Sequence, residues 1–200
     1  MIRHKESWLV AGIFLLALSL RLYGISFGLP YKYHSDEDFF VLHALKFGTG
    51  DLNPHWFLYP SLYMYLLFFL YGIFFIVGKI LGVFHTTFDF VTLYFTNASA
   101  FYLIGRFTTA LLGSMTTILL YLIGKKLFSE KIGMIAAFFL ATTFLHIQDS
   151  HYVTTDIPMT FILTLAFLLL SSFALAQSQE LQEKGGIYAI VKDAGGETVE

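Results

Sequence analysis

Residues Ile157–Ala176 read IPMTFILTLAFLLLSSFALA and contain no charged side chain. A helix needs about 20 mostly apolar residues to cross a bilayer, so this segment predicts a membrane span. Further apolar stretches cover residues 8–22, 60–84, 100–128 and 132–147. The whole chain is 56% hydrophobic and 13% charged, with a mean hydropathy of +0.69. This composition predicts an all-α, polytopic transmembrane protein and argues against a soluble domain.

The first apolar stretch follows a basic start at residues 3–5 and closes at Arg21. A signal peptide and a retained anchor share this pattern, but no small-residue cleavage site follows, which favours the anchor. The positive-inside rule then predicts a cytoplasmic N-terminus and an extracytoplasmic segment over residues 24–59. The lysine cluster between the third and fourth stretches should also face the cytoplasm; it comprises Lys125, Lys126 and Lys131.

The predicted extracytoplasmic segment contains a short amphipathic pattern after its acidic residues. Its apolar positions are Phe39, Phe40, Leu42, Leu45 and Phe47. This spacing predicts a juxtamembrane helix that lies along the membrane surface and ends at the glycines that follow.

The number of crossings between residues 60 and 156 stays open. The lysine cluster places Asp156 on the same side as Asp36, but three crossings between Tyr59 and Asp156 would separate them. Either residues 86–103 add a crossing, or residues 60–84 re-enter without spanning.

Two acidic segments precede predicted helices and are candidates for chemistry. They read YHSDED over residues 33–38 and HYVTTDIP over residues 151–158. Each could simply cap its helix. Together they could converge on one cavity, as a general base and its orienting partner require. Arg21 and Arg106 lie within or beside apolar stretches, so each should snorkel or face an anion such as a lipid phosphate.

Other kinds of site find little support in the composition. The chain has no cysteine, which excludes disulfides and thiolate metal ligands. A net charge of −2 and scattered basic residues give no sign of a nucleic-acid partner. His146 and His151 have poor spacing for one metal on one helix face.

Several short motifs occur in a characteristic order. They are Arg21-Leu22-Tyr23-Gly24, Tyr33-His34-Ser35-Asp36-Glu37, Asn53-Pro54-His55-Trp56-Phe57-Leu58-Tyr59-Pro60-Ser61-Leu62-Tyr63, Gly105-Arg106, Gly124-Lys125-Lys126-Leu127-Phe128, and His151 with Thr155-Asp156-Ile157-Pro158. In this order they resemble the N-terminal part of family 39 glycosyltransferases, the protein O-mannosyltransferase-like and aminoarabinose-transferase-like membrane enzymes of the GT-C fold. The resemblance covers about residues 8–176.

The resemblance implies that a sugar passes from a polyprenyl-phosphate carrier to a lipid, glycan or protein acceptor. Transfer would invert the anomeric carbon, on the extracytoplasmic face of a multi-pass cell-membrane protein. Asp36 matches the family's catalytic acid, with Glu37 beside it. Asp156 matches the second acid, for which we expect an orienting role.

The same resemblance implies residues that bind substrate. Arg106 matches an arginine near the carrier phosphate, and His151 and His34 are expected to contact substrate. It implies no fixed cofactor and leaves the need for a divalent cation open. Because family members are much longer, the sequence predicts their N-terminal membrane region at residues 1–176 and a polar tail at residues 177–200.

Two other classes of function stay open. A transporter could relay ions through Asp36 and Asp156, and a non-catalytic membrane scaffold could use both acids as helix caps. The acids lie at helix ends and in loops, which favours chemistry at the membrane surface over an intramembrane relay.

Overall fold

The computed structural model describes residues 4–31 and 34–195, with side chains for residues 7–31 and 34–182. Within this part the chain forms helices and no strand. The elements are α1 (His4–Leu22), α2 (Ser35–Lys46), the short 3₁₀ helix η1 (Phe47–Thr49), α3 (Leu62–Ile80), α4 (Thr87–Thr96), α5 (Ser99–Leu127), α6 (Glu130–Thr142), α7 (Phe144–Asp149) and α8 (Asp156–Gly195). The predicted all-α fold is confirmed.

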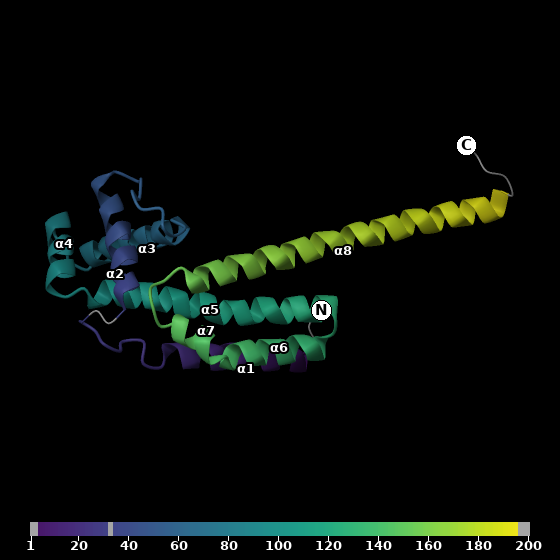
Figure 1. Ribbon diagram of the computed structural model, residues 1–200, viewed down its shortest axis with the longest axis horizontal. Helices are drawn as coiled ribbons and strands as arrows, with labels where there is room; N and C mark the ends of the chain where they lie inside the picture. The colour runs from purple at the N-terminus through teal and green to yellow at the C-terminus, as the bar shows by residue number, and fades with distance from the viewer. Residues whose placement is uncertain (1–3, 32–33, 196–200) are drawn as a thin grey trace.

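The long helices form a bundle, and the shorter ones gather mainly at one end of it. Helices α1, α5 and α6 lie side by side, and α8 begins beside α5 and then diverges (Figure 1). Helices α3, α5 and the Asp156–Gln182 part of α8 are long and apolar enough to cross a membrane, whereas the apolar part of α1, Ser7–Leu22, is shorter. This arrangement is that of an integral membrane protein with several helices.

Most predicted apolar stretches correspond to single helices, but residues 132–147 do not. They are divided between α6 and α7, because Thr143 adopts an extended conformation with φ −65° and ψ 116°. The polar tail predicted from residue 177 begins inside α8, which stays helical to Gly195. Side chains beyond Gln182 lie outside the described residues, so the proposed division of the chain stays a prediction.

Two observations support the second alternative for the crossings, in which residues 60–84 do not span. Helix α4 has 10 residues, about half of what a span needs. Arg106, near the start of α5, donates to the carbonyls of Ile25 and Phe27, which follow α1. The end of α1 and the start of α5 therefore lie at the same end of the bundle. The chain between them, α3 included, makes no net crossing.

Helix α3 lies across the first turns of α5. The Tyr63 hydroxyl, near the start of α3, donates to the Gly105 carbonyl at 3.1 Å. Two turns later, the Tyr71 hydroxyl donates to the Phe101 carbonyl at 3.2 Å. Because distant parts of α3 meet neighbouring residues of α5, the two helices cross rather than run together. The stretch predicted at residues 60–84 is thus helical but does not carry the chain to the other end.

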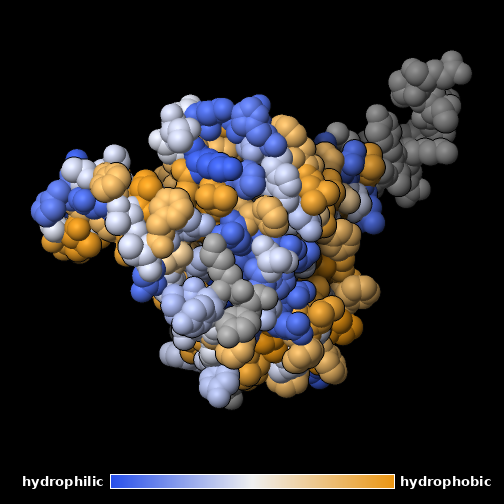
Figure 2. Space-filling view, turned by 60° about the vertical axis from the view of Figure 1, so that its left-hand side comes forward, coloured by the Kyte–Doolittle hydropathy of each residue, from blue (hydrophilic) through white to orange (hydrophobic). Residues whose placement is uncertain are grey.

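Helix α2 forms where the amphipathic pattern was predicted, but its buried face differs from the predicted one. Its buried apolar side chains, Phe40, Val41 and Ala44, join a core with α3, whereas Phe39 is 47% exposed. Trp56, from the loop before α3, stacks on Phe39 with ring centroids 5.3 Å apart. Figure 2 brings this end of the molecule forward and shows hydrophilic side chains gathered near its middle, with hydrophobic ones around them. The polar end of the bundle therefore rests on an aromatic core.

Candidate active site

The three consecutive acids at the start of α2 have different surroundings. Successive residues of a helix point about 100° apart, so their carboxylates diverge. Glu37 is fully buried and accepts hydrogen bonds from Nε and Nη2 of Arg106 at 2.8 and 2.7 Å. It also accepts from the backbone N–H of Val153 at 2.9 Å. Glu37 thereby joins α2 to α5 and to the segment before α8.

The other two acids, Asp38 and Asp36, also differ from each other in their hydrogen-bond partners. The Asp38 carboxylate accepts hydrogen bonds from the hydroxyls of Tyr94 and Tyr102, at 2.9 and 2.8 Å, and so connects α2 to α4 and α5. Asp36 is partly exposed and accepts a hydrogen bond from the neighbouring Ser35 hydroxyl at 3.2 Å. Among the described residues, Asp36 is the acid of this group that bonds to no other element.

Arg106 neither snorkels nor faces solvent. It is 2% exposed, and its Nη1 donates to the carbonyls of Ile25 and Phe27 at 2.9 Å each. Together with its bonds to Glu37, these contacts use four of its five N–H groups. The remaining N–H belongs to Nη2, on a side chain that lines a cavity.

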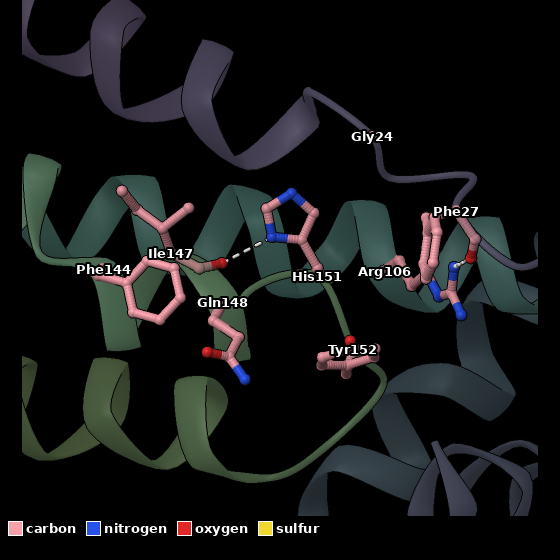
Figure 3. A pocket seen from close by; sticks show the side chains of 8 residues that line it. All are labelled: Gly24, Phe27, Arg106, Phe144, Ile147, Gln148, His151 and Tyr152. Atoms are coloured by element: carbon pink, nitrogen blue, oxygen red, sulfur yellow. Dashed lines mark hydrogen bonds between the residues drawn. The ribbon is translucent and has the colours of Figure 1, made fainter. Parts of the chain in front are cut away.

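That cavity, of about 250 Å³, lies between the end of α1, α5 and α7 (Figure 3). Its lining comprises Gly24, Phe27, Arg106, Phe144, Ile147, Gln148, His151 and Tyr152. Apolar side chains form much of its wall, and its polar groups come from an arginine, a histidine and a glutamine. Such a lining suits a ligand with an apolar part and an anionic part.

Two backbone carbonyls hold the His151 ring beside this cavity. Its Nδ1 lies 2.7 Å from the carbonyl oxygen of Ile147, and its Nε2 lies 2.8 Å from that of Tyr23. A carbonyl oxygen can only accept, so each contact uses a ring N–H when the proton is on that nitrogen. The contact with Tyr23 joins the segment after α7 to the end of α1.

The second acidic segment lies at the same end of the molecule as the first. The His34 ring contacts that of Tyr152, with centroids 4.6 Å apart. Asp156 is exposed at the start of α8. Burial raises the pKa of the Asp149 carboxyl, the charge of Asp156 raises it further, and His34 acts in the opposite sense. The structure thus brings His34, Asp149 and Asp156 near one another, while Tyr33 of the first motif lies outside the described residues.

Arg21 follows neither of the two expectations for it. It is fully buried, so it does not snorkel, and it faces no anion among the described residues. Its guanidinium donates to the carbonyls of Leu140 and Ala141 at the end of α6, and to Nδ1 of His146 at 2.8 Å. The expectation failed because the sequence does not show that the end of α6 lies beside the end of α1.

A metal site finds no support in the described side chains. Among them, no group of three histidine, cysteine or acidic residues could hold a metal ion. His146 and His151 direct ring nitrogens to Arg21 and to backbone carbonyls, respectively.

Sequence reasoning gave no role to three residues of this region: Gln148 and Tyr152, which line the cavity, and Asp149, whose pKa the charge of Asp156 raises. Their position within three residues of His151 was the available signal. It was weak, because neither a glutamine nor a tyrosine marks a particular chemistry by its type.

Comparison with known proteins gives one match. Residues 102–191 match the family model for dolichyl-phosphate-mannose-protein mannosyltransferases. No curated protein and no solved structure gives a significant match. The match supports the predicted resemblance to GT-C membrane glycosyltransferases, and it includes Arg106, His151 and Asp156. It does not extend to α2 and its three acids.

Proposed function

We propose that this chain works in a membrane glycosyltransferase that moves a sugar from a polyprenyl-phosphate carrier to an acceptor hydroxyl on the extracytoplasmic face. The family match supports sugar transfer of the GT-C type. The observation that carries the choice of base is the contrast within α2: Glu37 and Asp38 hold other elements, whereas Asp36 bonds to its neighbour Ser35.

In this mechanism Asp36 acts as the general base. It takes the proton of the acceptor hydroxyl while the oxygen attacks the anomeric carbon of the sugar. The bond from that carbon to the carrier phosphate breaks on the opposite side, and the phosphate leaves with the bonding electrons. A single displacement of this kind inverts the anomeric carbon. Asp156 orients the acceptor, and His34, whose ring contacts that of Tyr152, lies near Asp149.

The cavity beside α7 is the proposed place for the carrier phosphate. The fifth N–H of Arg106, which bonds to none of the described residues, would donate to the phosphate as negative charge develops on it, and His151 lies on the same cavity wall. Phe144 is 77% exposed at the start of α7, where it could contact a prenyl chain. Glu37, by contrast, is assigned a positioning role, because both of its oxygens already bond to the protein.

Replacement of the proposed base tests this function. Membranes that contain the protein are supplied with radiolabelled polyprenyl-phosphate mannose, and sugar transfer is measured for Asp36→Asn and for Asp51→Asn. Asp51 is the matched control, an exposed acid of the loop after α2 that pairs with His55. We expect Asp36→Asn to reduce transfer about 100-fold or more, the usual effect of a lost general base, and Asp51→Asn to transfer normally. Normal transfer by Asp36→Asn would refute the assignment.

A further inference from the structure

Arg21 is a buried cation at the end of a membrane helix, and no carboxylate among the described side chains neutralises it. Such a charge is costly in a membrane protein unless other groups compensate it. Here the compensation comes from backbone carbonyls: Nη1 donates to Ala141 at 3.2 Å, and Nη2 donates to Leu140 at 3.3 Å. The last carbonyls of a helix carry its partial negative charge, so Arg21 of α1 caps α6 from outside.

The same guanidinium fixes the next helix. Nη2 of Arg21 lies 2.8 Å from Nδ1 of His146. An arginine can only donate, so Nδ1 accepts and the ring proton of His146 lies on Nε2. Helix α7 begins after the extended Thr143, and this contact ties it to α1. Arg21 therefore spans the break between α6 and α7.

From His146 the connection continues to the candidate active site. The Ser150 hydroxyl donates to the His146 carbonyl at 2.6 Å, and the hydroxyl of Thr109 in α5 donates to the Ser150 carbonyl at 3.2 Å. The next residue is His151, which borders the cavity, and Val153 then donates to Glu37. The placement of α7 thus sets the path of the chain to Asp156.

Gly113 of α5 allows this cluster to form. A Cβ atom there would lie 2.6 Å from Oγ of Ser150 and 3.0 Å from Nε of Arg21. The first distance is one that Cβ atoms essentially never show and the second is tight, so a side chain at Gly113 would force the Ser150 hydroxyl to move and crowd the guanidinium. Gly12 of α1, in contrast, has no neighbour within 4 Å of such an atom.

We propose that Arg21 is a positioning residue: it caps α6 and holds His146, and so places α7 and the segment His151–Asp156 against the cavity. The effect of this placement on activity rests on the proposed function, because the segment His151–Asp156 carries Asp156, the proposed acceptor-side acid. Whether Arg21 places α7 can be tested without any measurement of activity.

Spin labels measure that placement directly. Cysteines are introduced at Ser35 and Gln148, both exposed, into a chain with no native cysteine, and the label distance is measured in nanodiscs. We expect one narrow distance distribution in the parent and in Gly12→Ala. We expect a shifted or broadened one in Arg21→Lys, which keeps the charge but lacks the planar donor fork, and in Gly113→Ala, which keeps the arginine. An unchanged distribution in both test variants would overturn the proposal.

A spectroscopic signature separates positioning from general loss of structure. In protein labelled with ¹⁵N-histidine, the signals of His146 are identified by their absence in His146→Gln. We expect the Nε2–H tautomer in the parent and a mixture of tautomers in Arg21→Lys. Persistence of the single tautomer would overturn the contact. If both structural readouts behave as expected while the parent transfers no sugar from polyprenyl-phosphate mannose, the proposed function fails and the role of Arg21 in placing α7 stands.

Discussion

The carboxylate of Glu37 and the guanidinium of Arg106 form a bidentate pair in which both side chains are buried. Two charges in such a place stabilise the fold only as long as they face each other, because each has lost its water. The pair also forms hydrogen bonds with backbone groups of the segments before α2 and before α8. It is therefore the contact through which the sequence assembles the polar end of the molecule.

Removal of one partner should be costly. We expect Glu37→Gln to destabilise the protein by about 3–5 kcal/mol, the usual range for a buried charge left without its partner. Asp36→Asn, one residue away and partly exposed, should change stability by less than about 0.5 kcal/mol. Thermal unfolding in detergent, followed by size-exclusion chromatography, compares the two. Equal melting temperatures would contradict the structural role assigned to Glu37.

These different roles could not be predicted from the sequence. It showed three acids at a helix start, and capping explained all three equally well. The distinction depends on partners far along the chain, Arg106 for Glu37 and two tyrosines for Asp38, which only the folded arrangement supplies. The second acidic motif was predictable as a helix start and as a possible neighbour of the first, but the particular contacts, Val153 with Glu37 and Tyr152 with His34, were not.

At the scale of elements, the turn between α5 and α6 depends on two glycines. A Cβ atom at Gly124 would lie 2.6 Å from the Gly133 Cα, and one at Gly133 would lie 2.5 Å from the Tyr121 carbonyl oxygen. Backbone atoms meet backbone atoms here, so no side-chain rotation can relieve the contact. The two helices pack closely because neither has a side chain at this point.

A methyl group at this contact should push the helices apart. We expect Gly133→Ala to destabilise the protein by about 1–3 kcal/mol, the usual cost of an overpacked contact. Gly72→Ala is the matched control, because a Cβ atom there has no neighbour within 4 Å and alanine favours the helix. Thermal unfolding of both variants measures the difference. A melting temperature of Gly133→Ala equal to that of the control would show that the helices are not held so closely.

The helices themselves were largely predictable, and their directions were not. Apolar length identifies α5 and α8, since both must remain apolar over a bilayer's thickness. Apolar length alone would predict that α3 spans the membrane as well, yet α3 lies across the first turns of α5. Hydropathy reports what surrounds a helix and not how it is inclined, so the crossing problem needed the contacts of Arg106 with the segment after α1 and those of Tyr63 and Tyr71 with α5.

At the scale of the whole molecule, the acids near the cavity and two lysines of α5 lie at opposite ends of the bundle. The acids of α2 and α7 lie at one end, and the start of α1 lies at the other, near the last turn of α5, which carries Lys125 and Lys126 (Figure 1). The positive-inside rule would place the lysine end in the cytoplasm. The acidic end, with the cavity, would then face outward, as the proposed transfer requires.

Single cysteines in the cysteine-free chain test this arrangement. They are placed at exposed positions: Ser35 before the body of α2, His85 after α3, Gln148 in α7 and Lys126 at the end of α5. Intact cells are treated with a membrane-impermeant thiol reagent, and a second sample is treated after permeabilisation. Because α3 makes no net crossing, we expect the first three to react in intact cells and Lys126→Cys to react only after permeabilisation.

The pattern of labelling separates two ideas. If His85→Cys behaves like Lys126→Cys, α3 spans the membrane and the arrangement of α2 to α5 described above is wrong. If the first three positions react only after permeabilisation while Lys126→Cys reacts in intact cells, the acids still share one end. The chain is then inverted in the membrane, and transfer on the extracytoplasmic face is excluded although the site itself is unaltered.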